Sequence, residues 1–370
     1  MKVGVLIAFA GRNCGGPEVY EREIARAMLA VAPQHEYHLY CLDSRGSTVI
    51  GLKSESVFYH QLQPQIRAAA LLAGLPRAMA RSRPDVFYAP ILPPPFCPTK
   101  AIIAMPCSSL LHHPEFYPPL VRMRLRFFFH RAVRKAAKII CPSLQVRESL
   151  EERLKIPSDK LAVIHPGVSP VFHRIAEQEK RRHVEEIHGI RSPYFLFSGR
   201  WEARKNLVRT LKAFALFKRR YGSPHKLVLT GGHSWDSQEV AMLLEQPELR
   251  GSVANLGKTD TAELPYLYGA ADALLYASLW EGFGLPIIEA MACGTPVITS
   301  NLAAMPETAG GAALLVDPYS EEDMAAAMGR ITSDTNLRDE LREHGFRRAK
   351  CFSWEKTAQQ TLDLYLEIAS

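Results

Sequence analysis

The stretch Glu281-Gly-Phe-Gly-Leu-Pro-Ile-Ile-Glu289 places two carboxylates eight positions apart, and the small-residue run Ala290-Met-Ala-Cys-Gly294 follows it. The first carboxylate precedes a Gly-Phe-Gly turn, and the second lies on the helix predicted after that turn. Backbone N–H groups at such a turn can bind phosphate, and a carboxylate further along the helix can accept hydrogen bonds from sugar hydroxyls. Alternatively, Glu289 only pairs with a surface cation, but the small residues indicate close helix packing. The stretch therefore predicts one wall of a nucleotide-sugar site.

Short apolar runs alternate with helical patterns on the N-terminal side of this stretch and beyond it. This alternation predicts parallel sheets covered by helices on both faces, which is an α/β class of fold. The predicted strands are 3–9, 37–42, 85–89, 101–105, 138–141, 161–165, 194–198, 226–230, 253–256, 273–276, 295–299 and 314–316. The predicted helices are 17–30, 119–137, 145–153, 206–221, 261–270, 286–292 and 321–331.

A length of 370 residues exceeds the usual size of one domain, so two domains are expected. The polar, charged segment 173–191 interrupts the alternation and predicts a boundary between domains 1–172 and 188–353. Two doubly wound units joined there would face each other across a cleft between the carboxyl ends of their strands, where such folds bind ligands.

Composition indicates a soluble enzyme, with 47% hydrophobic and 22% charged residues. No apolar run approaches the roughly 18 residues of a membrane span, and the apolar N-terminus is better interpreted as a first strand than as a signal peptide. The seven cysteines are scattered without a Cys-x-x-Cys pair. They are expected to be core residues in a reducing compartment, so the predicted location is cytoplasmic.

Charge is distributed unevenly: residues 1–180 carry a net +10, and residues 181–370 carry −3. The first half is therefore expected to meet an anionic partner, either a membrane surface or a phosphorylated acceptor. The predicted basic, aromatic helix around 122–135 could contact such a surface, although a solvated basic face is the simpler interpretation. Zinc spacing and nucleic-acid motifs are missing from the sequence, so no nucleic-acid partner is expected.

In each half of the chain, one further turn follows the first strand. Gly15 and Gly16 precede Pro17 and could bring backbone close to a phosphate, although a plain strand-helix turn is as consistent with this motif alone. In the second half, the segment from Ser198 to Asn206 contains Arg200, Arg204 and Lys205. These cations could hold a diphosphate, or they could form a solvated basic loop. Both interpretations remain open at this point.

Taken together, the segments resemble the retaining glycosyltransferase family 4, whose members have the GT-B fold of two Rossmann-like domains. The resemblance covers nearly the whole chain and is strongest in its second half. Its motifs are Gly199-Arg200 with Lys205, Leu256-Gly257, Ala271-Asp272, Glu281-Gly-Phe-Gly-Leu-Pro, Glu289-Ala-Met-Ala-Cys-Gly-Thr-Pro-Val and Pro306-Glu307. It also implies that the last helix, 354–370, completes the first domain.

The resemblance implies a role for each matched residue. Arg200 and Lys205 would hold the donor diphosphate and stabilise the leaving nucleotide, while Glu281 would lie near the transferred sugar and Glu289 would bind the ribose. The remaining donor contacts would come from Gly15, Gly16, Lys258, Thr259, Phe283, Gly284 and Leu285. The family generally needs no metal, and no Asp-x-Asp triplet is present here, so neither a metal nor another cofactor is expected.

The reaction expected from the resemblance is transfer of a hexose, from GDP-mannose, to a glycan or polyprenyl-linked acceptor. A UDP-sugar donor is the alternative within the same fold. A nicotinamide-dependent dehydrogenase is disfavoured, because the Gly-x-Gly-x-x-Gly fingerprint is missing. The enzyme would work in the cytoplasm, peripherally on the inner face of the membrane.

The chain departs from the family pattern at Pro106-Cys107, where many relatives have His-Asp. His112 or His113 could take over the missing acceptor-side role, although adjacent histidines usually lie in loops without a special role. A degenerate donor-binding protein without turnover is therefore a third hypothesis.

Overall fold

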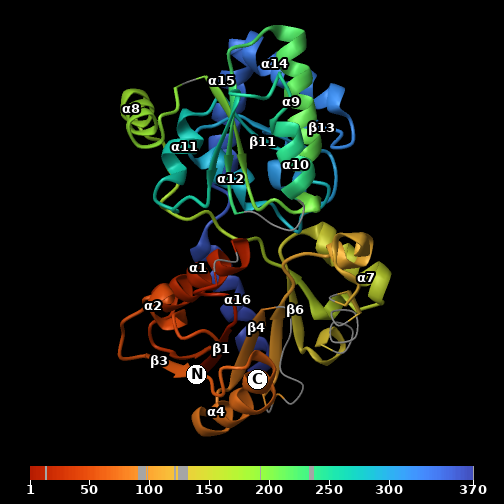
Figure 1. Ribbon diagram of the computed structural model, residues 1–370. Coiled ribbons are helices and arrows are strands. Elements are labelled where there is room, and N and C mark those ends of the chain that lie inside the picture. Colours follow the sequence, from red (N-terminus) through yellow and green to blue (C-terminus); the bar gives the residue numbers. More distant parts are fainter. Residues whose placement is uncertain are drawn as a thin grey trace. The chain divides into compact units, whose positions relative to one another are not determined.

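The computed structural model describes residues 1–12, 15–90, 97, 99–120, 122–123, 132–191, 193–232 and 237–369. The chain divides into two compact units, Met1–Gly167 with Ser353–Ser370, and Val168–Phe352. Each unit is built on its own parallel sheet (Figure 1).

The first unit has, among its described residues, seven parallel strands in the order β3-β2-β1-β4-β5-β6-β7. The strands are β1 Lys2–Ile7, β2 Glu36–Cys41, β3 Val57–Gln61, β4 Val86–Pro90, β5 Ala101–Ala104, β6 Lys138–Cys141 and β7 Leu161–Val163. The helices and helical turns are α1 Gly16–Val31, α2 Gly46–Ile50, α3 Arg67–Ala69, η1 Ala70–Gly74, α4 Leu75–Ser82, α5 Ser109–His112, η2 Pro114–Phe116, α7 Leu144–Leu154, η3 Ser158–Lys160 and α16 Trp354–Ala369.

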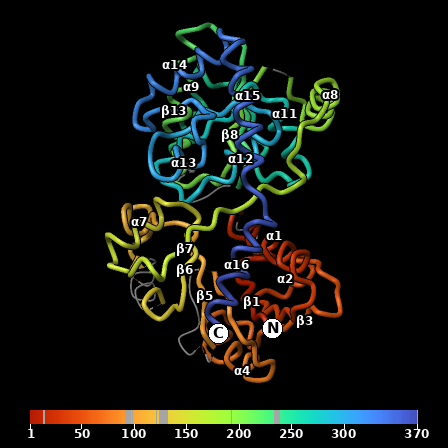
Figure 2. The backbone as a smooth tube through the Cα atoms, turned by 180° about the vertical axis from the view of Figure 1, so that it is seen from behind, coloured from red at the N-terminus to blue at the C-terminus, as the bar shows by residue number. Residues whose placement is uncertain are grey.

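The C-terminal helix α16 packs on α1 and so joins the first unit (Figure 2). Its buried face includes Trp354, Leu362 and Tyr365, which lie in one apolar cluster with β1 and β2. The Trp354 ring meets Tyr20 of α1 edge to face, with 5.3 Å between ring centroids. Burial of these aromatic rings contributes a large apolar area to the core of this unit.

The second unit has six described parallel strands in the order β10-β9-β8-β11-β12-β13. The strands are β8 Tyr194–Ser198, β9 Lys226–Thr230, β10 Val253–Gly257, β11 Ala273–Tyr276, β12 Val297–Ser300 and β13 Leu314–Val316. The helices are α8 Glu177–His188, η4 Ala203–Lys205, α9 Leu207–Tyr221, α10 Ser237–Leu244, α11 Leu264–Ala270, α12 Leu285–Ala292, α13 Met305–Ala309, α14 Glu321–Ser333 and α15 Thr335–Ala349.

The strand order reverses once in each sheet, between β1 and β4 and between β8 and β11. At such a reversal the connections leave in opposite directions, and the carboxyl ends of the two strands leave room for a ligand. The predicted α/β class with two doubly wound sheets is confirmed. A ligand site is therefore expected at the loops after β1 and β8.

Several predicted boundaries shift for local reasons. Strand β1 ends at Ile7 rather than at residue 9, because the next backbone N–H groups donate to a carboxylate instead of a neighbouring strand. Strand β12 begins only after Pro296, which lacks an N–H to donate to a ladder. The segment 173–191 contains α8, which packs on α11 in the second unit.

Two observed elements were not predicted, and one predicted helix lies partly outside the described residues. Strand β3 and helix α15 were not predicted: β3 is a short edge strand without a fully buried residue, and α15 is mostly polar and charged, so neither shows a clear apolar period. Residues 121 and 124–131 of the predicted helix 119–137 lie outside the described residues, and the described part is helical at 119–120, 122–123 and 132–135.

Candidate active site

Two turns meet at the reversal in the second sheet: the one after β8 and the one after β11. The first contains η4 and ends at Asn206, whose φ of 60° is left-handed, a conformation that asparagine tolerates better than most residues. The Asn206 amide donates to the carbonyls of Ala277 (3.0 Å) and Pro318 (2.7 Å). These two bonds tie the β8 turn to the chain that leaves β11.

A buried ionic cluster joins these turns. Both carboxylate oxygens of Glu281 accept from Arg204 Nη1 at 2.8 Å, and Lys205 Nζ lies 2.6 Å from Glu281 Oε1. Lys205 also donates to the Tyr276 hydroxyl. Glu281 and Lys205 are only 7% and 8% exposed, so these contacts act in a medium of low dielectric constant.

The cluster sets the protonation of its members. Burial alone would raise the pKa of Glu281, but the charges of Arg204 and Lys205 outweigh it and lower this pKa to about 2. Burial also lowers the pKa of Lys205, and the attraction of Glu281 opposes that effect. Glu281 is therefore a firmly ionised carboxylate that serves as counterion to two cations, and it is poorly suited to act as a general acid.

Positive charge exceeds negative charge around this turn. Arg204 Nε also pairs with Glu202 at 2.9 Å, and Arg200 Nε lies 3.5 Å from the other oxygen of Glu202. Three cations thus face two carboxylates, and the Arg200 side chain is 42% exposed. An anionic ligand at the carboxyl end of β8 would meet a net positive charge and one accessible guanidinium.

The second carboxylate of the motif, Glu289, lies on α12 and is 9% exposed. Its Oε2 accepts from the Tyr268 hydroxyl at 3.1 Å, and that hydroxyl lies 3.0 Å from Ser198 Oγ at the end of β8. Burial raises the pKa of Tyr268 well above its usual range, so the phenol remains a neutral donor. Glu289 is thereby held at the same reversal as the ionic cluster.

The turn before α12 presents backbone rather than side chains. Gly284 has a φ of 99°, and α12 begins at Leu285. The Phe283 ring packs edge to face on Phe352 with a centroid distance of 5.3 Å, and the Phe283 carbonyl accepts from Thr308. Because the ring is part of the core, any phosphate contact from this residue would involve its N–H.

The other predicted donor residues lie elsewhere on the two units. Lys258 and Thr259 follow β10, the edge strand of the second sheet, and Lys258 is exposed. Gly15 and Gly16 lie at the N-terminus of α1 in the first unit, where Gly15 has a φ of 69°. The structure therefore brings Arg200, Lys205, Glu281 and Glu289 together, and their predicted roles remain predictions.

The acceptor-side histidines follow β5 in the first unit. His112 Nε2 lies 2.9 Å from Ser149 Oγ, and burial lowers the pKa of His112, which favours its neutral form. His113 pairs with Glu115 at 2.9 Å and stacks on Phe116. At the departure from the family pattern, the half-buried Cys107 thiol donates to Ser109 Oγ at 3.2 Å.

Sequence reasoning assigned no role to Asn206, Tyr268 or Tyr276, and it grouped Arg204 with the cations that could hold a diphosphate without finding its partner Glu281. Arg204 is adjacent to Lys205 in the sequence, so its charge gave a signal, but only the folded turn shows which cations face Glu281. The two tyrosines have the pattern of core residues in a helix and a strand. Their hydroxyl partners are distant in sequence and left no signal.

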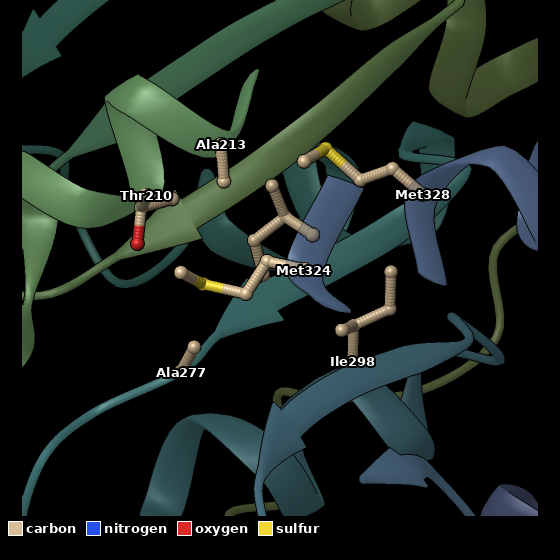
Figure 3. Close-up of a pocket in the computed structure, with 7 residues that line it drawn as sticks. Thr210, Ala213, Ala277, Ile298, Met324 and Met328 are labelled. Atoms are coloured by element: carbon tan, nitrogen blue, oxygen red, sulfur yellow. The ribbon is translucent and has the colours of Figure 1, made fainter. Parts of the chain in front are cut away.

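A small cavity lies in the core of the second unit, between α9, β11, β12 and α14 (Figure 3). Its wall is almost entirely apolar, and the one hydroxyl, that of Thr210, already donates to the Asn206 carbonyl at 2.9 Å. It is lined by Thr210, Ala213, Leu275, Ala277, Ile298, Met324 and Met328. The cavity is thus a packing defect rather than part of the site.

The described part of the chain contains neither a metal-binding cluster nor a membrane-spanning helix. No group of three or more His, Cys, Asp or Glu side chains there could hold a metal ion. Of the helices described, none combines the length and the apolar character that a membrane span requires.

Comparison with known proteins identifies the family. Residues 14–172 match the model of Glycosyltransferase Family 4, and residues 179–348 match that of Glycosyl transferases group 1. The chain is 30% identical over 269 residues to the O-antigen chain mannosyltransferase B of Escherichia coli, covering 72% of this chain and 70% of that protein.

Solved structures show the same fold at low sequence identity. The sucrose-phosphate synthase of Thermosynechococcus elongatus superposes with a TM-score of 0.82 and 20% identity, covering 99% of this chain and 98% of that one. Anabaena Alr3699/HepE in complex with UDP-glucose gives a TM-score of 0.77 and 17% identity, covering 99% and 100%. The chain therefore belongs to glycosyltransferase family 4, and it is a hexosyltransferase with the GT-B fold of two Rossmann-like domains.

Proposed function

We propose that this enzyme moves mannose from GDP-mannose to a glycan or polyprenyl-linked acceptor, with retention of configuration and without a metal ion. The observation that carries the proposal is the cluster of Arg204, Lys205 and Glu281, with Glu289 nearby on α12. The similarity to an O-antigen chain mannosyltransferase supports the sugar and the kind of acceptor. A UDP-sugar is the alternative donor, since Alr3699/HepE was solved with UDP-glucose.

The cationic turn fits the chemistry of the leaving group. When a nucleoside diphosphate departs, negative charge develops on its β-phosphate oxygens, and fixed cations aimed at that charge lower the barrier. Arg200 and Lys205 would supply this charge, which in other enzymes comes from a divalent ion. Glu281 would keep Lys205 in place beside the sugar, and Glu289 would accept hydrogen bonds from the ribose.

Retention is assigned to attack from the face that the diphosphate leaves. The acceptor oxygen would bond to the anomeric carbon as the carbon–phosphate oxygen bond breaks, and its proton would pass to a β-phosphate oxygen. This route needs no enzyme nucleophile. The ionised Glu281, already paired with two cations, is a poor candidate for that role.

The basic first half supports a peripheral position on an anionic membrane. Residues 1–180 carry a net +10, and Leu120 and Met123 expose 76% and 66% of their surface beside the exposed Arg122. Binding to anionic liposomes should fall as salt rises, because salt screens exposed charges. Sedimentation that is absent or insensitive to salt would remove this part of the proposal.

Ligand-induced stabilisation tests the donor. GDP-mannose should raise the thermal unfolding midpoint in the presence of EDTA, whereas UDP-glucose and UDP-N-acetylglucosamine should have little effect, because only a ligand that binds the folded state stabilises it. If only the UDP-sugars raised the midpoint, the donor would be a UDP-sugar and not GDP-mannose. No response to any nucleotide-sugar, together with background hydrolysis, would refute the proposed function.

Replacing Lys205 tests the role of the cluster in turnover. Lys205→Ala should lower kcat by about 10²–10³-fold, the usual cost of removing one group that stabilises charge in the transition state. Lys212→Ala is the matched control, because Lys212 lies on α9 and pairs with Glu239 in an exposed ion pair at 3.4 Å. Equal kcat values for both variants and the unmodified enzyme would contradict the role of Lys205.

A further inference from the structure

The turn after β1 holds a buried carboxylate for which the proposed reaction has no use. Glu21 lies on α1 and is 1% exposed. Its Oε1 accepts from the backbone N–H of Ala8 at 2.9 Å, and its Oε2 accepts from those of Phe9 and Ala10 at 2.8 and 2.9 Å. A side chain of the helix thus receives three consecutive amides of the loop that leads into that helix.

These bonds fill a position that other doubly wound sheets leave to a ligand. The amides that follow the first strand commonly bind a phosphate. Here the next amide, that of Gly11, also donates to a carboxylate, Glu18 Oε1, at 2.9 Å. In the first unit, the N–H groups of this loop therefore donate to acids of α1 instead of to a ligand. The conformation of the loop depends on those acids.

The surroundings of Glu21 oppose its charge. Burial raises the pKa of Glu21 to about 7 despite the three amide donors, and the nearby charge of Glu18 raises it further. The other titratable groups that face it are neutral near pH 7: the Cys41 thiol at the end of β2 and the phenol of Tyr88 on β4, which is itself coupled to Tyr20 and Tyr365. A carboxylate in this setting can gain a proton close to neutral pH.

We propose that Glu21 is a positioning residue whose ionised carboxylate fixes the turn that carries Gly15 and Gly16 in the form that meets the donor diphosphate. This inference rests on the proposed function. When Glu21 takes up a proton from solvent, one oxygen becomes an O–H donor that faces an N–H donor, and at least one of the three bonds is lost. The loop from Ala8 to Gly11 then loosens, and the glycine turn loosens with it.

Donor kinetics across pH supply the test. If only the ionised form is competent, the donor KM of the unmodified enzyme should rise about 10-fold from about pH 8 to about pH 6, because the competent fraction falls to about one tenth. The change in kcat should be small. Glu21→Gln should show a raised KM that no longer depends on pH over this range.

Glu23→Gln is the matched control. Glu23 lies on the same helix at 7% exposure, but its carboxylate pairs with Arg22 at 2.9 Å instead of with loop amides. It should keep the pH profile of the unmodified enzyme. If Glu21→Gln shows the same KM and the same pH profile as the unmodified enzyme, the inference is overturned.

Hydrogen exchange separates failure of this inference from failure of the proposed function. Without any donor, amides in a peptide covering residues 5–12 should exchange faster in Glu21→Gln than in Glu23→Gln at equal pH. Unchanged exchange would overturn the positioning role even if the enzyme is active. If the unmodified enzyme turns over no nucleotide-sugar, the proposed function fails while exchange still tests the loop.

An NMR titration of the unmodified enzyme covers the case in which Glu21→Gln does not fold. The amide proton shifts of Ala8, Phe9 and Ala10 should titrate together with a midpoint near pH 7, because all three donate to the same carboxylate. That midpoint should match the midpoint of the KM profile. Amide shifts that stay constant across this range would overturn the inference.

Discussion

The turn after β1 and the turn after β8 occupy the same place in their sheets but carry opposite charge. After β1, the acids Glu18 and Glu21 accept the loop amides. After β8, the cations Arg204 and Lys205 pair with the buried acid Glu281. The fold supplies a strand end beside a helix in both cases. Whether that position attracts an anion depends on which side chains satisfy the turn.

The two buried acids show how strongly the partner decides protonation. Glu21 and Glu281 are 1% and 7% exposed, so burial opposes the charge of both. Three neutral amides leave the pKa of Glu21 raised to about 7, whereas two full charges lower that of Glu281 to about 2. Opposite charges therefore outweigh burial where dipoles do not.

The largest expected difference is in folding stability. Glu281→Gln removes the charge that balances the buried Lys205 and one of the two carboxylates paired with Arg204, so it should lower the free energy of unfolding by about 3–5 kcal/mol. Glu239→Gln is the control, because it breaks only the exposed pair with Lys212 and should cost less than about 1 kcal/mol. Urea unfolding measures both, and similar small losses would show that the cluster is not a buried ion network.

The pH dependence of stability should have opposite signs for the two acids. The ordinary pKa of a glutamate side chain is 4.5. The contribution of Glu281, whose pKa is lowered, is present above about pH 4.5 and is lost as pH falls toward 2. The contribution of Glu21, whose pKa is raised, is present below about pH 4.5 and is lost as pH rises through 7. Each contribution is on the order of 3 kcal/mol.

Urea titrations at several pH values would separate these contributions. Glu21→Gln should flatten the decline in stability between about pH 5 and about pH 8, and Glu281→Gln should flatten the decline on the acid side. If removing Glu21 instead steepened the decline toward alkaline pH, its carboxyl group would be ionised through a stabilising partner, and the contrast between the turns would fail.

Sequence patterns predicted the elements well but predicted little of how side chains meet. Sequence analysis could single out Arg200, Lys205, Glu281 and Glu289. They lie in or beside glycine-containing turns whose order and spacing match the family motifs. The bond between Lys205 and Glu281 joins residues 76 positions apart, and only the strand order brings them together. The partners of Glu21 are backbone amides, which carry no sequence signal at all.

Helix α8 illustrates the other limit. Its residues are mostly charged, with Val184 as its buried apolar anchor, so the segment resembled a polar boundary rather than part of a domain. It is held instead by polar contacts, including that of His183 with Glu263 at 2.8 Å next to α11. A helix that packs through hydrogen bonds and ion pairs leaves a weak apolar period, and period is what sequence analysis detects.

The smallest expected effect concerns how Glu289 is held. Its carboxylate accepts from a side-chain hydroxyl, that of Tyr268, whereas Glu21 accepts from backbone amides. Tyr268→Phe should therefore raise the donor KM by about 5–10-fold, the equivalent of one hydrogen bond at about 1 kcal/mol, and leave kcat nearly unchanged. Steady-state kinetics with varied donor would measure this split.

Tyr194→Phe provides the matched comparison for that variant. Tyr194 is as fully buried as Tyr268, and its hydroxyl donates to the Leu267 carbonyl at 2.7 Å, one residue before Tyr268 in the same helix. Both variants remove one buried hydroxyl, although that of Tyr268 also contacts Ser198 Oγ, and each should cost about 1–2 kcal/mol of stability. Only the loss at Tyr268 should change the donor KM. An equal change in both variants would mean that α11 as a whole, rather than the bond to Glu289, determines donor affinity.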